Sequence, residues 1–188
     1  MLRQHCVGVV TLAVWILVSQ PISEARTTRS RIPDVPTKPS VGLQLTLSFD
    51  KASYTASDPI LLTLALQNIG TQAVWVTKRF FISAKEVPPQ QRDVYLEATP
   101  PSGQALVSTY TYETGFPRTD LFIELRPGEE AAAEHQANLR YYFDCKEPGT
   151  YQVVAVYENV FGPELGLDTF RGMVRSAPAS FTIEAAAP

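Results

Sequence analysis

The chain has 188 residues, with 16 Lys and Arg against 19 Asp and Glu and a formal net charge of −3. This length suits one domain that can bury a core of ordinary size. The mild excess of acidic residues argues against nucleic acid as a partner.

The first 25 residues have the pattern of a secretory signal peptide. Arg3 gives a basic start, residues 6–18 are almost wholly apolar, and Ser23 and Ala25 offer small side chains before a cut after Ala25. The apolar run of about 13 residues is shorter than the roughly 20 that span a bilayer. The sequence therefore predicts a secreted or periplasmic protein without a stable membrane span after cleavage. Retention of the segment as an N-terminal anchor is the alternative.

Residues 26–40 are rich in Pro and Arg and are expected to form a solvated linker before a domain over 41–188. Cleavage would leave Cys145 as the one cysteine, so the domain would have no internal disulfide. A lone exported thiol is either reactive, paired between chains, or a small buried filler. We expect Cys145 to be a small buried side chain that fills space in the core.

The chain from residue 41 alternates apolar and polar residues in short runs. Strands are expected over 41–49 and 60–67, where every second residue is Leu, Ile or Phe. A third is expected over 73–82, which contains Trp75. A core position is expected for Trp75, and stacking on a ligand is the alternative. Further strands are expected over 93–98, 104–112, 120–126, 130–138, 169–175 and 179–185, with one helical turn over 139–143.

The most regular stretch begins at Pro148-Gly149, which predicts a tight turn. It leads into a strand in which Tyr151, Val153, Ala155 and Tyr157 share one face while valines occupy the other. A strand that is apolar on both faces is expected in the centre of a sheet. Tyr151 would organise the fold as the tyrosine of a tyrosine corner does, by bonding back to the chain a few residues upstream.

Turns about every ten residues and the absence of long helical periods predict an all-β fold. We expect an immunoglobulin-like antiparallel β-sandwich of about seven to ten strands.

Catalytic motifs are missing from the sequence. His135 is the one histidine beyond the signal-like segment, and neither a Gly-x-Ser-x-Gly elbow nor a phosphate-binding glycine loop occurs. One His and one Cys cannot build a structural zinc site, so no metal and no cofactor is predicted. A loop calcium site stays open, because Glu129, Glu130 and Glu134 could share an edge. The sequence therefore predicts that the protein is not an enzyme.

Two aromatic stretches are candidate binding surfaces. The first, over 107–122, contains Tyr110, Tyr112 and Phe116, and the second, over 157–170, contains Phe161 and Pro163. Aromatic residues on the loops of a sandwich serve as recognition anchors, or they plug the open ends of the core. Both interpretations remain open for these five residues.

Three motifs resemble the immunoglobulin-like domains of exported bacterial proteins. They are Tyr-x-x-x-Asp-Pro-Ile (54–60), Leu-x-Pro-Gly-Glu (125–129) and the Pro-Gly-Thr-Tyr turn before Tyr151. The chain is similar in style to the intracellular proteinase inhibitor-like domains and to the sandwich domains of macroglobulin-type proteins. The resemblance implies the architecture and carries no functional residue. It departs from antibody domains at Val153, where those domains have a cysteine.

These observations predict an exported, non-catalytic binding module that acts through surface contacts with an extracytoplasmic protein or another extracytoplasmic ligand. One alternative is a protease inhibitor that acts through the loop 159–168. The other is a carbohydrate-binding module that uses Tyr110 or Trp75.

Overall fold

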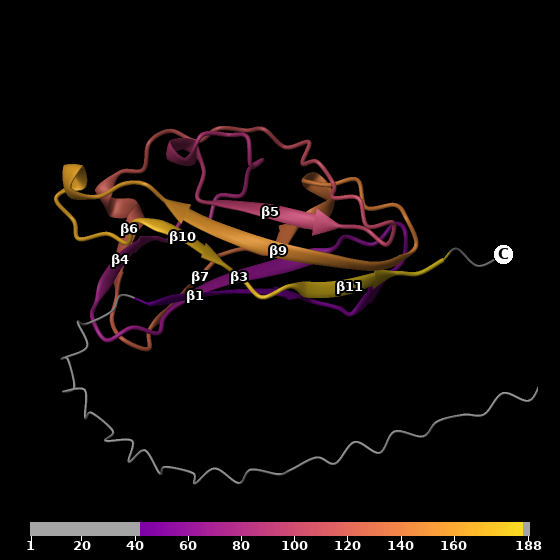
Figure 1. Cartoon of the computed structure of the whole chain (residues 1–188), viewed down its shortest axis with the longest axis horizontal. Coiled ribbons are helices and arrows are strands. Elements are labelled where there is room, and N and C mark those ends of the chain that lie inside the picture. Colours follow the sequence, from indigo (N-terminus) through magenta and orange to yellow (C-terminus); the bar gives the residue numbers. More distant parts are fainter. Residues whose placement is uncertain (1–41, 186–188) are drawn as a thin grey trace, which may run out of the picture. The chain divides into compact units, whose positions relative to one another are not determined.

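The computed structural model describes residues 42–185, so the predicted signal peptide and linker lie outside the described residues. The described part is all-β, and its helical turns are short 3-10 segments (Figure 1). The strands are β1 (Leu43–Phe49), β2 (Ser53–Tyr54), β3 (Leu61–Asn68), β4 (Val74–Thr77), β5 (Val94–Thr99), β6 (Phe122–Leu125), β7 (Glu130–Ala132), β8 (Ala137–Asn138), β9 (Gly149–Asn159), β10 (Gly172–Arg175) and β11 (Ala179–Ile183). The 3-10 turns are η1 (Pro89–Gln91), η2 (Thr119–Leu121), η3 (Leu139–Tyr141) and η4 (Pro163–Leu165).

The first sheet is built on β3. β1 pairs antiparallel with one edge of β3, in a register that places Leu45 opposite Leu66. β7 and β8 pair with β3 on the other side. The leucines at every second position of these strands point to the buried face: Leu45 and Leu47 in β1, and Leu62, Leu64 and Leu66 in β3. The strands expected over 41–49 and 60–67 are confirmed.

The second sheet is built on β9. β5 pairs with one edge of β9, while β10 and β11 pair with successive parts of its other edge, all antiparallel. β2 adds a short parallel pairing to β11. Tyr151, Val153, Ala155 and Tyr157 are all buried, and so is Val156 on the opposite face. The central position predicted for this strand is confirmed.

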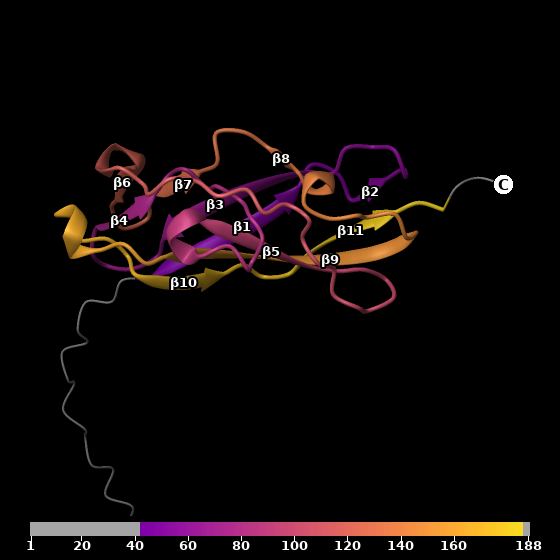
Figure 2. The same cartoon turned by 90° about the horizontal axis from the view of Figure 1, so that it is seen from above.

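The two sheets lie one over the other and enclose one apolar core, so the molecule is an antiparallel β-sandwich (Figure 2). β4 and β6 form a separate two-stranded pair at one end (Figure 1). The hydroxyl of Tyr157 joins that pair to β9, because it accepts a hydrogen bond from the Thr77 backbone N–H at 3.0 Å.

Tyr151 is part of an aromatic cluster centred on Phe181. Its ring is parallel to Phe181 of β11 at a centroid distance of 5.0 Å, and Phe181 in turn meets Phe49 and Tyr54 edge-on. Burial raises the pKa of the Tyr151 hydroxyl, and its contact with the backbone of Glu147, four residues upstream, opposes that rise. The cluster connects β1 and β2, near the start of the domain, with β9 and β11 near its end.

Two expectations about strands need correction here. Residues 104–112 form no strand, because their backbone groups bond to three separate segments. The N–H of Leu106 donates to the Ala98 carbonyl, and the N–H of Thr109 donates to the Tyr142 carbonyl. The Tyr110 carbonyl accepts from the N–H of Ala84. A ladder needs one continuous partner. The stretch 130–138 is split into β7 and β8, because residues 133–136 leave the sheet. The helical turn expected over 139–143 is confirmed as η3.

The third strand is shorter than expected, and Trp75 is not in the core. β4 ends at Thr77, and Phe80 then adopts a left-handed φ of 47°, which turns the chain away from the sheet. Val74 and Val76 point inward from β4, so Trp75 between them points to the outer side and is only partly buried. The core position expected for Trp75 is wrong for this reason.

Candidate functional site

An irregular segment covers the open side of the sandwich beside β5. Residues 104–118, here called the strap, run over this side as a loop above β5 (Figure 1). Residues 110–114 of the strap are hydrogen-bonded to the segment 83–91. The Ser83 hydroxyl donates to the Tyr112 carbonyl at 2.7 Å, and the Thr114 N–H donates to the Gln91 carbonyl at 3.1 Å. The strap therefore has a defined conformation without belonging to a sheet.

The strap brings the predicted aromatic residues to the surface. Tyr112 and Phe116 are 63% and 70% exposed. Tyr110 is partly buried, and its ring meets Tyr142 edge-on at 5.2 Å. Phe81 was not a predicted site residue, and its ring centroid lies 5.9 Å from that of Tyr112. Tyr110 thus plugs the edge of the core, while Tyr112 and Phe116 remain available to a partner.

The two aromatic stretches meet at one point. The rings of Phe116 and Phe161 lie edge-to-face with centroids 6.2 Å apart. The Phe161 carbonyl accepts hydrogen bonds from Asn159 and Thr169, which fixes the base of the second loop. Pro163 is exposed on η4, at the tip of that loop. Phe116 and Phe161 are therefore parts of one surface.

The loop 159–168 is compact. Gly162 is buried, and its N–H donates to the Glu164 carboxylate at 2.8 Å. Gly166, which directly follows η4, has a left-handed φ of 69°. A segment that lies in a protein groove as an added strand has to be extended. The predicted inhibitory loop instead has the form of a closed helical turn.

A buried ion pair lies below the end of the strap. The guanidinium of Arg79 donates to both carboxylate oxygens of Asp93, at 2.7 and 2.9 Å, and its remaining arm donates to the Gly115 carbonyl at 3.0 Å. Asp93 is 2% exposed and also accepts a bond from the Phe81 N–H. Arg79 thereby joins the β5 end of the sandwich to the strap.

A second arginine, Arg92, is buried and directly precedes Asp93 in the sequence. Arg92 lies 2.8 Å from the Glu158 carboxylate and stacks over the Tyr95 ring, with its guanidinium carbon 4.6 Å from the centroid. Its Nε donates to the Val87 carbonyl at 2.8 Å. Arg92 therefore fixes the segment to which the strap is tied.

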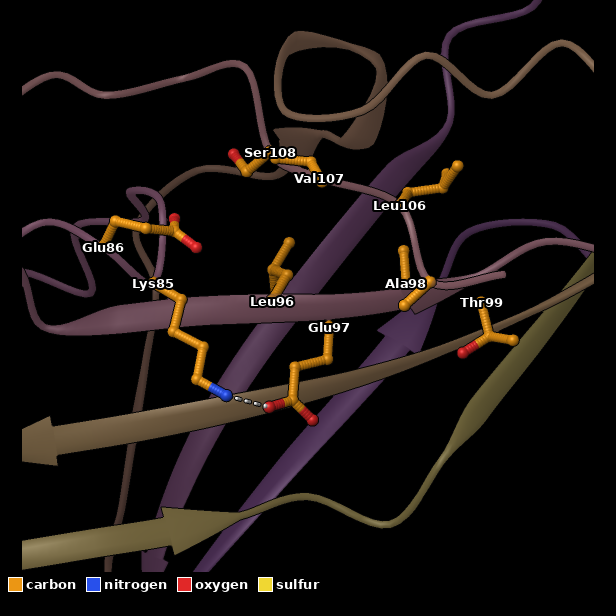
Figure 3. Close-up of a pocket in the computed structure, with 10 residues that line it drawn as sticks. Lys85, Glu86, Leu96, Glu97, Ala98, Thr99, Leu106, Val107 and Ser108 are labelled. Carbon is orange, nitrogen blue, oxygen red and sulfur yellow. Dashed lines mark hydrogen bonds and ion pairs between the residues drawn. The ribbon is translucent and has the colours of Figure 1, made fainter. Parts of the chain in front are cut away.

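A pocket of about 280 Å³ opens between β5 and the strap (Figure 3). Leu96 and Ala98 of β5 form one wall, and Leu106 and Val107 of the strap face them. Glu97 lies at the rim, where Arg175 and Lys85 contact its carboxylate. The hydrogen bond from Arg175, and with it that from Lys85, holds the pKa of Glu97 below its usual value. The pocket is an apolar cleft with a charged rim.

Cys145 and His135 differ in exposure. Cys145 is buried, which raises the pKa of its thiol to about 11. His135 is exposed between β7 and β8. Among residues 42–185, no group of three His, Cys, Asp or Glu side chains is arranged to hold a metal ion. In the same residues, no helix is long and apolar enough to cross a membrane.

Comparison with known proteins gives little further information. No family model matches the chain, and no curated protein matches it. Among solved structures, the chain is similar to a β-glucosidase from Erythrobacter marinus, with a TM-score of 0.37 and 16% sequence identity. The match covers 76% of this chain and 15% of that protein. A likeness of this degree carries no argument about activity.

Proposed function

We propose that this protein is an exported, non-catalytic β-sandwich of the immunoglobulin-like type, and that its strap binds an extracytoplasmic protein. The observation that carries the proposal is the pair Tyr112 and Phe116. Both rings are mostly exposed, although the backbone that holds them is fixed by hydrogen bonds to buried segments. Large exposed aromatic side chains on a fixed backbone are typical binding hot spots.

The fixed backbone matters because ordering a flexible loop on binding lowers affinity. The carbonyls of Tyr112 and Gly115 already have donors in Ser83 and Arg79. Phe116 is further held by its contact with Phe161. A partner would therefore meet a surface that is largely in its bound form. The compact turn 159–168 contributes Phe161 to this surface, and its closed form gives no support to action as an inhibitory loop.

The experiment compares two double variants of the purified protein as bait in the envelope or secretion fraction of its host. Tyr112→Ser with Phe116→Ser removes the exposed strap rings. Tyr141→Ser with Met173→Ser removes two side chains that are equally exposed, at 70% and 60%, but lie off the strap. We expect a partner that binds the wild type and the control variant and is lost from the strap variant.

The captured partner is then purified, and its affinity is measured directly. Loss of two hot-spot aromatics is expected to weaken binding at least about 30-fold, which corresponds to roughly 2 kcal/mol. Equal binding by the strap variant would contradict the proposal. Binding of a glycan that is lost on changing Tyr110 or Trp75, and not on changing Tyr112 and Phe116, would favour the carbohydrate-binding alternative over the proposal.

A further inference from the structure

β1 is the border strand of the first sheet, and within residues 42–185 one of its edges has no partner strand (Figure 1). The Asp50 N–H donates to the Leu61 carbonyl, and the Gly42 carbonyl accepts from the Ile69 N–H. These bonds flank β1, and an antiparallel ladder alternates, so the even-numbered residues between them bond to β3. The N–H and C=O groups of the odd-numbered residues therefore point to the open edge. They belong to Leu43, Leu45, Leu47 and Phe49.

Edges elsewhere in the two main sheets are short, covered or charged. The outer edge of β5 is occupied by backbone bonds to Phe81 and Leu106. β10 has four residues and ends in Arg175, while β7 and β8 have three and two residues. Short strands and edge charges are devices that prevent the addition of another strand. β1 has none of them, because it has seven residues and contains no charge, no proline and no glycine.

The sequence of β1 is self-complementary about Thr46. When two copies pair antiparallel around that residue, Thr46 lies opposite its own copy and Gln44 lies opposite Ser48. All three side chains are exposed and uncharged, so no like charges meet. On the inner face Leu43 would lie opposite Phe49, and both are only partly buried in the single chain. In this register the odd-numbered residues form the hydrogen-bonded pairs, so the free backbone groups of β1 satisfy one another.

The segment that precedes β1 is a poorer partner for this edge. Residues 33, 36 and 39 are proline. Proline has no N–H to donate to a ladder and is found in sheets only at edges, strand starts and bulges. A second copy of β1 instead supplies a donor at every position.

We propose that two copies of this chain associate through β1, antiparallel about Thr46, so that their first sheets join into one continuous sheet. A strand of seven residues is only about 23 Å long, so the interface is small. We therefore expect a reversible dimer that forms as the concentration rises. The interface lies on residues 43–49 and not on the strap, so this proposal stands independently of the binding function proposed above.

The first measurement is analytical ultracentrifugation of the purified protein over a range of concentrations up to its solubility limit. We expect the mean mass to rise from that of one chain toward that of two. The mass of one chain at every concentration would overturn the proposal.

Cysteine variants test the register, in a Cys6→Ser background that leaves the buried Cys145 as the remaining native thiol. Thr46→Cys places two thiols in a non-hydrogen-bonded pair, whose Cα atoms lie about 4.5 Å apart, within the span of a disulfide. We expect mild oxidation to link this variant into dimers.

Gln44→Cys is the matched control, because it is equally exposed on the same strand. Its two copies would lie four residues apart along the ladder, roughly 13 Å, which is too far for a disulfide. A mixture of Gln44→Cys and Ser48→Cys should nevertheless cross-link, since these positions lie opposite each other. If Thr46→Cys formed no more linked dimer than Gln44→Cys alone, the pairing about Thr46 would be refuted.

Charge gives a test that does not depend on cross-linking. Thr46→Lys brings two like charges together at the centre of the pair and is expected to weaken the dimer about two- to fivefold. Mixing Thr46→Lys with Thr46→Glu should restore association. Gln152→Lys is the control, because Gln152 is exposed on β9, which is paired on both edges. Thermal unfolding checks that each variant folds, and equal association of Thr46→Lys and the wild type would contradict the proposal.

Discussion

The Arg79–Asp93 ion pair offers a sharp test of how the strap is held. Arg79→Met keeps the aliphatic stem but leaves the Asp93 carboxylate, 2% exposed, with the Phe81 N–H as its remaining donor. Removing one partner of a buried pair typically costs 3–5 kcal/mol. Arg79 is itself partly accessible, at 16%, so water can enter in its place. We therefore expect a loss near the lower end, about 3 kcal/mol.

The assay is urea unfolding of the wild type, Arg79→Met, and the double variant Arg79→Met with Asp93→Asn. The double variant removes the buried charge and is expected to recover part of the lost stability. Arg118→Met is the matched control, because Arg118 also contacts both oxygens of a carboxylate, that of Asp120, but on the exposed surface. We expect no measurable change there.

The result that would refute the reasoning is an Arg79→Met variant as stable as Arg118→Met. Hydrogen exchange gives a second readout. Loss of the bond to the Gly115 carbonyl should speed exchange of strap amides in Arg79→Met more than in β9. Equal acceleration in both segments would mean that the ion pair stabilises the whole fold and has no particular role at the strap.

Three further outcomes are expected. Tyr157→Phe should lower the free energy of unfolding by about 1–3 kcal/mol, because the buried Thr77 N–H loses its acceptor; denaturant titration measures this. Cys145 should react with a thiol reagent at pH 8 only after unfolding, since burial raises its pKa to about 11; equal rates for native and denatured protein would contradict this. The hydrogen bond from Arg175 lowers the pKa of Glu97 in the folded protein. The stabilisation that this bond gives is therefore present above the ordinary glutamate pKa of 4.5 and is lost as the pH falls below that value. The free energy of unfolding of Glu97→Gln, measured by denaturant titration at several pH values, should fall less steeply over that range than that of the wild type.

The sheets could be predicted because their side chains obey a local rule. In β1 and β3 burial alternates from residue to residue, and in β9, which is apolar on both faces, Val156 is buried as well. β2 could not be found, because a strand of two residues carries no period. Trp75 was misplaced for a related reason: in an apolar run, pattern alone does not fix which face points inward.

The candidate site was predicted only as separate parts. Tyr112 and Phe116 were named from composition, but their display depends on hydrogen bonds from Ser83 and Arg79, which are distant in sequence. The meeting of Phe116 with Phe161 depends on how two loops cross at one end of the sandwich. Buried Asp93 looks like any surface acid in the sequence, since its burial results from tertiary structure.

The position of β9 in the chain has a consequence for synthesis. β1 and β3 pair through a short connection, so they can form a hairpin early. In the second sheet β9 and β10 have a similarly short connection, but β5 must wait for β9, which lies beyond the whole strap. Non-local pairings of this kind form slowly. During synthesis, β5 should therefore remain unpaired until β9 has been made.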